Sequence, residues 1–346
     1  GVIMQFTGKD NSFTYTLTGL IFSCVFCIAV FITWYSTWEA KDVHQEYDFK
    51  VDTQRSSGVI NHLKYLVLDL FSSFRIRAFR LHILIYIFSF TAMDVFGSVF
   101  TYYVVYCLSQ DAAAVSGWLS IAAFASVPGT YGFMLLLNRL NMTPSAALRL
   151  SYSCIFLVLA FLFTVYLTKT EVPTLLFSAV FILLGAARSG LYYIPWNIYS
   201  FIPDIDEIVT QQRREGIFAG VMVLTRKSTV AIAIMIIGLV LQESGFVKGS
   251  GAQPESALGA IIGLMIFATA ALLAVSFFAT YKFKLTRETH KVLLKEIARR
   301  KLGGDYRDCD ASTRVVIKQL TGYEYDQVWG GDATRLAVGE NLSTVK

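Results

Sequence analysis

The chain alternates long apolar runs with shorter polar segments. About 20 consecutive apolar residues span a bilayer core, and seven runs reach that length, at roughly residues 14–37, 81–108, 113–138, 144–168, 174–200, 216–241 and 257–281. The first run is too long for the hydrophobic part of a signal peptide, and it lacks a basic segment before it and a small-residue cleavage site after it. The pattern predicts an all-α integral membrane protein with seven transmembrane helices.

The spacing of these runs predicts how the chain is organised. The last six follow one another closely, whereas a mostly polar stretch separates the first from the rest. A long linker followed by six helices is typical of the second half of a transporter built from two six-helix bundles. We therefore expect an extracellular segment with the last helix of an N-terminal bundle (1–37), a cytoplasmic central linker (38–80), a six-helix C-terminal bundle (81–281) and a cytoplasmic amphipathic tail (282–346). On this interpretation the other N-terminal helices are missing, and a start at Gly1 rather than Met suits a fragment.

Two helices are predicted in the tail. Residues 286–301 form a basic amphipathic pattern with Thr286 as the N-cap, and residues 311–320 follow Asp310 as N-cap and stop before Gly322. The first of them either lies on an anionic membrane surface or docks under the bundle. From residue 330 onward the composition indicates disorder.

Composition and charge support a membrane protein and suggest its orientation. Of 346 residues, 55% are hydrophobic and 16% are charged, against about a quarter charged in soluble proteins. Lys and Arg gather in alternate loops and in the tail, which predicts an extracellular N-terminus and a cytoplasmic C-terminus in a multi-pass protein of a cell membrane, for example a bacterial cytoplasmic membrane. Five cysteines form no disulfide framework, and no HExxH, Walker or GxSxG motif is present. We expect no enzyme and no nucleic-acid partner.

Four ionisable residues fall near the bilayer midplane, about 16–20 Å into their helices at 1.5 Å rise per residue: Asp94, Arg188, Arg226 and Lys227. A charge at that depth is costly and marks a candidate functional site. Asp94 belongs to a polar stripe with Thr91, Ser98, Thr101 and Tyr102, which must face protein or a water-filled cavity. A structural hydrogen-bond cluster between helices is the alternative.

Two other runs carry candidate binding residues. Tyr192, Trp196 and Asn197 lie near Arg188, and aromatic, amide and guanidinium groups together suit a sugar ring; for Trp196 the alternative is the interfacial aromatic belt. In the next run, Thr225 precedes Arg226 and Lys227. Three central cations face a single central acid, which predicts carboxylates supplied from outside this bundle and a cation-coupling role for residues 225–227.

The segment PDIDEIVTQQRREGIF (203–218) concentrates charge between two apolar runs. We expect Pro203 to end one helix and Glu215 to open the next. One interpretation is a solvated charged loop whose ion pairs contribute little. The other is a gate, in which acids pair with arginines or with basic residues of the linker when the cavity closes to the cytoplasm. Its members are Asp204, Asp206, Glu207, Arg213 and Arg214.

Several segments resemble the glycoside–pentoside–hexuronide:cation symporters, the melibiose-carrier-like branch of the major facilitator superfamily. They are FRLHILIYIFSFTAMDVFGSVFTYYVVYCL (79–108), PDIDEIVTQQRREGIFAGVMVLTRKS (203–228), SGF (244–246) and KLTRETH with LLKEIARRKLGG (284–304), and the likeness runs from about 14 to 330. The resemblance implies a twelve-helix fold of two bundles, alternating access, and sugar or glycoside uptake driven by Na⁺ or H⁺ without another cofactor.

The resemblance also implies roles for single residues. Lys227 looks like the family's helix-eleven lysine near the cation site, and Trp196 is similar in position, within one residue, to its sugar-stacking tryptophan on helix ten. The family's cation-binding aspartates lie on helices two and four, which have no counterpart in this chain.

Two other functions stay open. The same fold carries other substrates, such as a lysolipid, although the face with Tyr192, Trp196 and Asn197 favours a sugar. A seven-helix receptor has the same topology, but the long first inner loop and the unpaired central cations argue against it.

Overall fold

The computed structural model describes residues 12–37, 70, 72–110, 112–169 and 172–329, and it divides into two units, Gly1–Lys64 and Tyr65–Lys346. In the first unit, α2 (Ser12–Ser36) is a single apolar helix. Everything described below belongs to the second unit. The linker over 38–69 and the tail after 329 lie outside the described residues, so the predicted disorder from 330 onward stays a prediction.

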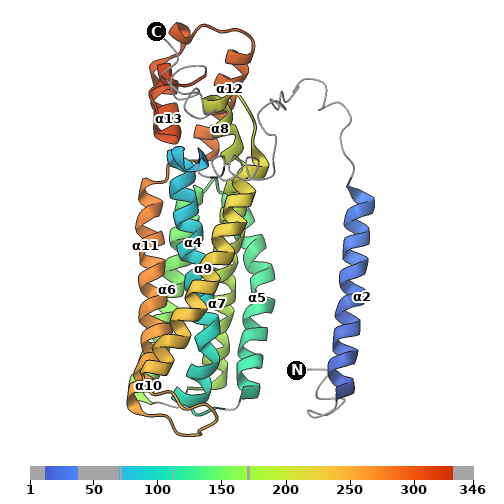
Figure 1. Ribbon diagram of the computed structural model, residues 1–346, viewed down its shortest axis with the longest axis vertical. Helices are drawn as coiled ribbons and strands as arrows, with labels where there is room; N and C mark the ends of the chain where they lie inside the picture. Colours follow the sequence, from blue (N-terminus) through green and yellow to red (C-terminus); the bar gives the residue numbers. More distant parts are fainter. Residues whose placement is uncertain (1–11, 38–69, 71, 111, 170–171, 330–346) are drawn as a thin grey trace, which may run out of the picture. The chain divides into compact units, whose positions relative to one another are not determined.

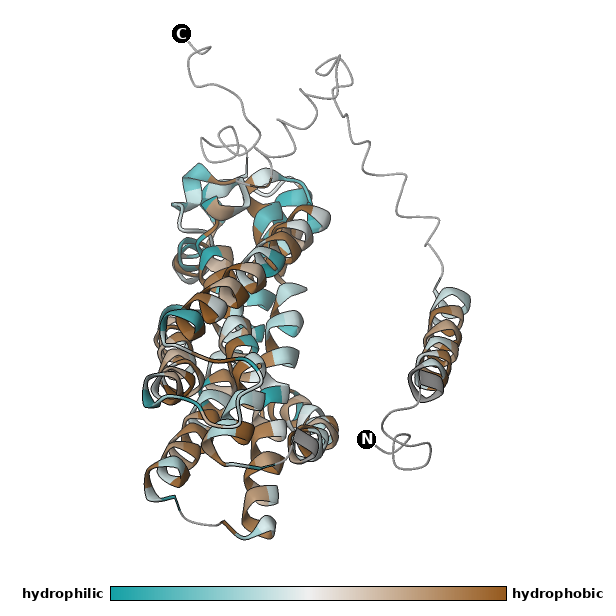
Figure 2. Ribbon diagram, turned by 60° about the horizontal axis from the view of Figure 1, so that its bottom comes forward, coloured by the Kyte–Doolittle hydropathy of each residue, from teal (hydrophilic) through white to brown (hydrophobic). Residues whose placement is uncertain are grey.

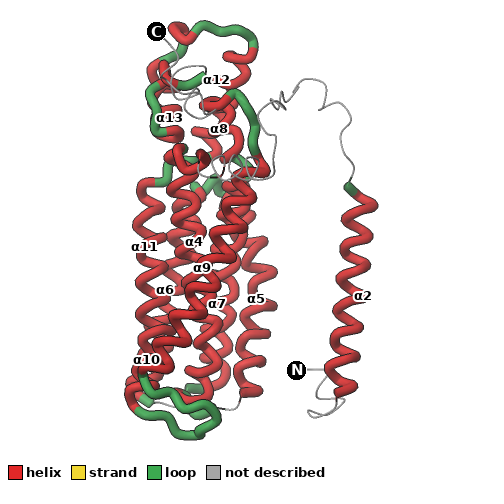
Figure 3. The backbone as a smooth tube through the Cα atoms, in the orientation of Figure 1, coloured by secondary structure: helices red, strands yellow, loops and turns green. Residues whose placement is uncertain are grey.

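The second unit contains six long helices that run side by side (Figure 1). The first five are α4 (Arg77–Tyr102), α5 (Ala112–Asn138), α6 (Pro144–Thr168), α7 (Thr174–Tyr199) and α9 (Glu215–Glu243). The sixth consists of α10 (Glu255–Ile262), the π-helical turn η4 (Gly263–Ala268) and α11 (Thr269–Lys282). With α2 they make seven helices that are long and apolar enough to cross a membrane, as predicted. Figure 3 shows helices joined by loops, and no strand occurs among the described residues.

Capping residues mark several helix ends. Thr143 precedes α6 in an extended conformation and accepts a hydrogen bond from the Ala146 amide at 3.3 Å, as an N-cap does. In the tail, α12 (Arg287–Lys301) begins after Thr286 with a reciprocal capping box, and α13 (Ala311–Thr321) begins after Asp310. Gly322 ends α13 with a φ of 89°, which glycine adopts at little cost. The two tail helices and their caps are as predicted.

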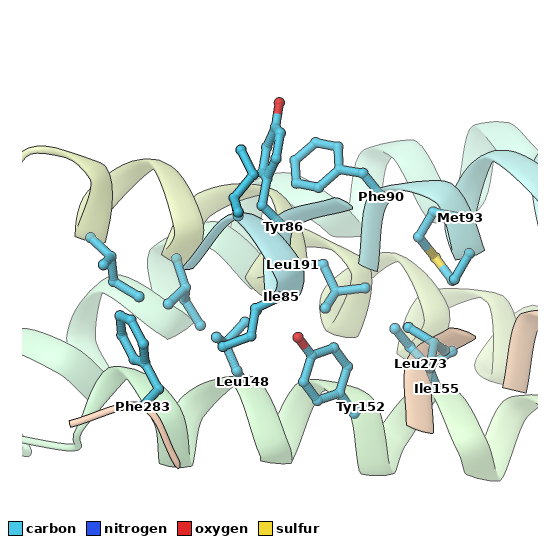
Figure 4. Close-up of a cluster of buried hydrophobic side chains, with 14 of the residues drawn as sticks. Ile85, Tyr86, Phe90, Met93, Leu148, Tyr152, Ile155, Leu191, Leu273 and Phe283 are labelled. Atoms are coloured by element: carbon cyan, nitrogen blue, oxygen red, sulfur yellow. The ribbon is translucent and has the colours of Figure 1, made fainter. Parts of the chain in front are cut away.

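A polar network joins three helices inside the apolar core. The Ser89 hydroxyl lies 2.8 Å from the Tyr152 hydroxyl and 3.2 Å from that of Ser276, which links α4 with α6 and α11. Apolar side chains surround this network, including Leu148, Ile155 and Leu273 (Figure 4). Buried hydroxyls that find partners avoid the cost of an unmade hydrogen bond, about 1–3 kcal/mol each.

Small residues let α5 and α7 approach each other closely. A Cβ atom on Gly185 would lie 2.0 Å from the Ala122 carbonyl oxygen, and one on Gly129 would lie 2.6 Å from the Ala186 Cα. Such contacts between backbones are typical of helix pairs in membranes, where small residues replace the hydrophobic effect as the means of close packing. Gly185 and Gly129 therefore serve close packing between these helices.

The polar end of the second unit departs from the sequence prediction. Residues 202–210 were expected in a loop after a helix ended by Pro203, but they form α8 (Ile202–Thr210), and α7 ends before it at Tyr199. Pro203 lies in the first turn of α8, where its missing N–H has no partner to lose. Hydrophobic residues predominate along the long helices, and hydrophilic residues concentrate at the end of the unit that carries α12 and α13 (Figure 2).

Candidate functional site: a central ion pair and aromatic cluster

Asp94 on α4 and Arg226 on α9 form a two-pronged ion pair. The Arg226 Nη1 lies 2.6 Å from Asp94 Oδ2, and its Nη2 donates to Asp94 Oδ1 at 2.8 Å. Both side chains are partly buried, at 20% exposure for Arg226 and 23% for Asp94. The planar guanidinium matches a carboxylate in this arrangement, so the pair fixes the orientation of both groups.

Four aromatic rings extend from this ion pair. The Arg226 Cζ lies 5.3 Å from the centre of the Phe90 ring, within reach of a cation–π interaction. Phe90 contacts Tyr86 with ring centres 4.5 Å apart and meets Tyr192 edge-on at 4.7 Å. Tyr86 in turn meets Trp196 edge-on at 6.0 Å. Figure 4 shows the Tyr86 hydroxyl directed away from the core residues Tyr152 and Leu273.

Arg188 completes the group on α7. Its Nη2 donates to the Tyr192 hydroxyl at 3.1 Å, and its Cζ lies 5.2 Å from the centre of the same ring. Three helices thus bring together one acid, two guanidiniums and four rings, which we name the central cluster: Tyr86, Phe90, Asp94, Arg188, Tyr192, Trp196 and Arg226. The structure places five candidates from the sequence, Asp94, Arg188, Tyr192, Trp196 and Arg226, in it.

Tyr86 and Phe90 were missed by the sequence analysis. Both lie in an apolar run, where an aromatic residue is most simply explained by the core. The available signal was spacing: Tyr86, Phe90 and Asp94 follow at intervals of four, which places them on one face of α4. Aromatic residues one and two turns before an intramembrane acid were therefore readable as its neighbours.

Three candidate residues lie apart from the central cluster or bond elsewhere. Tyr102 packs against Tyr106 and edge-on against Phe246, toward the end of α4 remote from α12. Asn197 lines a cavity near Thr286 and Arg287 at the start of α12. The Thr225 hydroxyl donates to the Val221 carbonyl at 2.7 Å, within its own helix.

Lys227 differs from its neighbour Arg226. Its side chain is exposed, and no ion pair involves it in the described part of the chain. One of the three central cations is therefore neutralised by Asp94, while the other two, Arg188 and Lys227, have no carboxylate partner among the residues described here. The surplus of positive charge expected from the sequence is still present in the folded unit.

Three acids of 203–218, Asp204, Asp206 and Glu207, are buried. Asp204 Oδ2 lies 2.7 Å from His290 Nε2 of α12, and its Oδ1 lies 3.5 Å from Arg213 Nη1. Glu207 Oε1 lies 2.5 Å from Lys301 Nζ at the end of α12. The exposure of the two acids is 7% and 6%. A solvated loop is therefore the wrong description of these residues, and two of their partners come from α12, which was not expected.

A second pair closes the same segment. The Arg214 Nε donates to Asp206 Oδ2 and its Nη2 to Asp206 Oδ1, both at 2.8 Å. Its Nη1 donates to the Ser72 hydroxyl at 3.1 Å. Asp206 is 1% exposed. Breaking a buried pair by removing one partner leaves an uncompensated charge, which costs about 3–5 kcal/mol. We name the segment 202–215 with its partners on α12 the charged clamp.

Comparison with known proteins agrees with the helical architecture. Residues 2–287 match the family described as MFS/sugar transport protein. The chain is also similar to an uncharacterized symporter from Synechocystis sp. (strain ATCC 27184 / PCC 6803 / Kazusa), with 28% identity over 266 residues, which is 74% of this chain and 47% of the relative. The chain thus spans about half the length of this curated relative. The match over most of its residues shows that the chain belongs to the melibiose-carrier-like sugar transporters of the major facilitator superfamily.

Proposed function

We propose that the chain forms part of a secondary transporter that takes up a sugar or glycoside by alternating access, coupled to Na⁺ or H⁺. The observation that carries this proposal is the central cluster. The exposed ring of Trp196 and the partly exposed ring of Tyr192 suit the apolar side of a sugar, and the guanidinium of Arg188 suits its hydroxyls. Tyr86 and Phe90 are buried and pack against these two rings. Membership of a sugar transporter family supports the same substrate class.

Ion coupling is proposed for Lys227 with Thr225 and Arg226 beside it. Lys227 is exposed beside a pair that already neutralises Arg226, and it lacks an acid in the described residues. Carboxylates that bind the coupling cation would therefore come from helices outside this unit. A lysine close to such acids would replace the cation when the ion leaves, because each stabilises the same negative charge.

Ligand-induced stabilisation tests the substrate class. A panel of neutral disaccharides should raise the free energy of unfolding by about 1.4 kcal/mol at ten times the dissociation constant. Trp196→Ala should remove most of this gain, whereas Phe124→Ala, at an 80% exposed aromatic on α5, should not. Stabilisation by lysolipids with none by sugars would move the substrate class to lipids.

For the charged clamp we propose a gate on the cytoplasmic side, with the C-terminus cytoplasmic and the protein in a cell membrane such as the bacterial cytoplasmic membrane. Asp204, Asp206 and Glu207 hold their cations in the described conformation, and opening would have to separate at least some of these pairs. Arg214→Glu should then raise the labelling rate of a cysteine placed at Ser98, an exposed residue of α4. Arg213→Glu, at a half-exposed position, should change it less. Equal labelling rates in the wild type and Arg214→Glu would refute the gate.

A further inference from the structure

A second cavity lies at the end of the bundle opposite α12 and α13. Its volume is about 780 Å³, within the 300–1,000 Å³ typical of sites for small molecules. Residues from η3 (Tyr103–Cys107) and the turn after it, from α5, α6 and α7, and from α10 line it. Among them are Tyr106, Gln110, Trp118, Tyr166, Lys169 and Glu255.

This cavity is separate from the central cluster. Tyr106 lies twelve positions after Asp94 on the same helix, which corresponds to about 18 Å along the axis. The clamp residues lie at the other end of the bundle, where α8 packs beneath α12 and α13 (Figure 1). A ligand in this cavity would contact neither the ion pair of Asp94 nor the charged clamp.

The backbone around the cavity departs from regular helix. Residues Tyr103–Cys107 form a π-helical turn, in which the Leu108 amide donates to the Tyr103 carbonyl at 3.1 Å. Two non-glycine residues of the lining, Ser109 and Lys169, have positive φ angles of 52° and 50°. Such turns and left-handed residues cost free energy and concentrate at functional sites.

Trp118 has a donor that its surroundings leave unused. Its ring packs on Phe177 at 4.8 Å and lines the cavity, but its buried Nε1 has no hydrogen-bond partner among the described residues. A buried indole N–H usually finds an acceptor. A ligand hydroxyl that reaches it would supply the missing bond.

The chemistry of the lining points to a neutral sugar, and we propose that this cavity is a second saccharide-binding site at the end of the bundle opposite the tail. Lys169 and Glu255 carry the only charges of the described lining and cancel each other. Aromatic rings of Tyr106, Trp118 and Tyr166 with the amide of Gln110 suit a ring with hydroxyls. Five helices surround the cavity at their ends, so a soluble ligand fits better than a lipid tail in the bilayer.

Thiol labelling tests this site, because Cys107 lies in its wall. In the full chain with the other four cysteines changed to serine, the labelling rate of Cys107 by a maleimide should fall with melibiose, lactose or sucrose. At ten times the dissociation constant the fall is about tenfold, because the rate follows the unoccupied fraction. A matched chain that keeps only Cys154, which does not line the cavity, should show no change. If Cys107 does not react without sugar, Ser109→Cys in a cysteine-free chain replaces it as reporter.

Variants separate this site from the central cluster. Trp118→Phe or Gln110→Ala should abolish protection, whereas Asp94→Asn/Arg226→Gln, which alters the central cluster, should retain it. The inference shares only the class of ligand with the proposed function, so protection that persists in a chain unable to transport supports the second site alone. Unchanged labelling with all three sugars would overturn it. Protection by glycine betaine or a lysolipid without any by sugars would do the same, as would loss of protection in the Asp94→Asn/Arg226→Gln chain.

Discussion

Arg226 and Lys227 are adjacent in sequence but have different surroundings. Successive residues on a helix point about 100° apart, so Arg226 reaches Asp94 on α4 while Lys227 stays exposed. The ion pair holds the Arg226 guanidinium over Phe90. Of the two cations, Lys227 is therefore the one left available to an acid from outside the described unit.

Removing the charge of Asp94 should destabilise the bundle. Asp94→Asn leaves the Arg226 guanidinium without its counter-charge, and we expect a loss of about 1–3 kcal/mol, less than for a fully buried pair because both side chains are about a fifth exposed. The double variant Asp94→Asn/Arg226→Gln should recover part of that loss. Thermal unfolding in detergent micelles measures both.

Lys227→Gln is the matched control, because its exposed side chain has no ion pair in the described structure. It should change stability by less than about 0.5 kcal/mol. The free energy of unfolding lost in Asp94→Asn/Arg226→Gln could equal the sum of the losses in Asp94→Asn and in Arg226→Gln. That result would show that the Asp94–Arg226 contact contributes no coupling energy.

Residue types were easier to predict than their partners. Intramembrane charge alone identified Asp94, Arg188 and Arg226 as candidates, because few explanations exist for a charge at that depth. The pairing of Asp94 with Arg226 joins residues 132 positions apart, and no local pattern encodes such a contact. Tyr86 and Phe90 were not predicted as neighbours of Asp94, because aromatic residues in an apolar helix are most simply explained by core packing.

At the scale of elements, α8 shows why a charged segment was taken for a loop. Its acids are of the type that usually faces water, and in the folded unit Asp204 and Glu207 pair with residues of α12 while Asp206 pairs with Arg214. The partner of Asp204, His290, lies 86 positions downstream. The caps of α12 and α13, by contrast, were predictable because a cap bonds amides within three residues.

The tail should loosen in acid. Burial disfavours ionisation of Glu296, but hydrogen bonds from Arg299 and Tyr325 outweigh burial and lower its pKa from the ordinary 4.5. Because the folded pKa is the lower one, the stabilisation is complete above that ordinary value and is lost as pH falls through the folded pKa. Amide hydrogen exchange of residues 311–329, corrected for intrinsic rates, should be constant from about pH 8 to 5 and should rise below about pH 4.

Glu296→Gln is the control for this pH dependence. It removes the titrating group and the ion pair with Arg299, so exchange of residues 311–329 should already be faster at neutral pH and should rise less in acid. Protection that falls between pH 8 and 5 instead would assign the acid response to another group.

At the scale of the whole molecule, the described unit has six membrane-length helices and more central cations than acids. The chain spans about half the length of its curated relative. These facts agree with a transporter whose binding site is shared between two bundles. The fold class and the family were predictable because the lengths of the apolar runs, the charge of the loops and long motifs are local properties of the sequence. The contacts of the central cluster were not predictable, because no local pattern encodes which side chains of α4, α7 and α9 meet.

Ion-driven uptake tests the account most directly. The protein encoded by the whole reading frame that contains this chain would be reconstituted in vesicles. Uptake of a labelled disaccharide would then be measured with an inward Na⁺ or H⁺ gradient and without one. The account predicts gradient-dependent uptake that Lys227→Ala reduces by at least about tenfold, equivalent to about 1.4 kcal/mol. An exposed-residue control, Phe124→Ala, should transport normally. Gradient-driven uptake unchanged by Lys227→Ala would contradict the coupling role, and the absence of sugar uptake under either gradient would contradict the function.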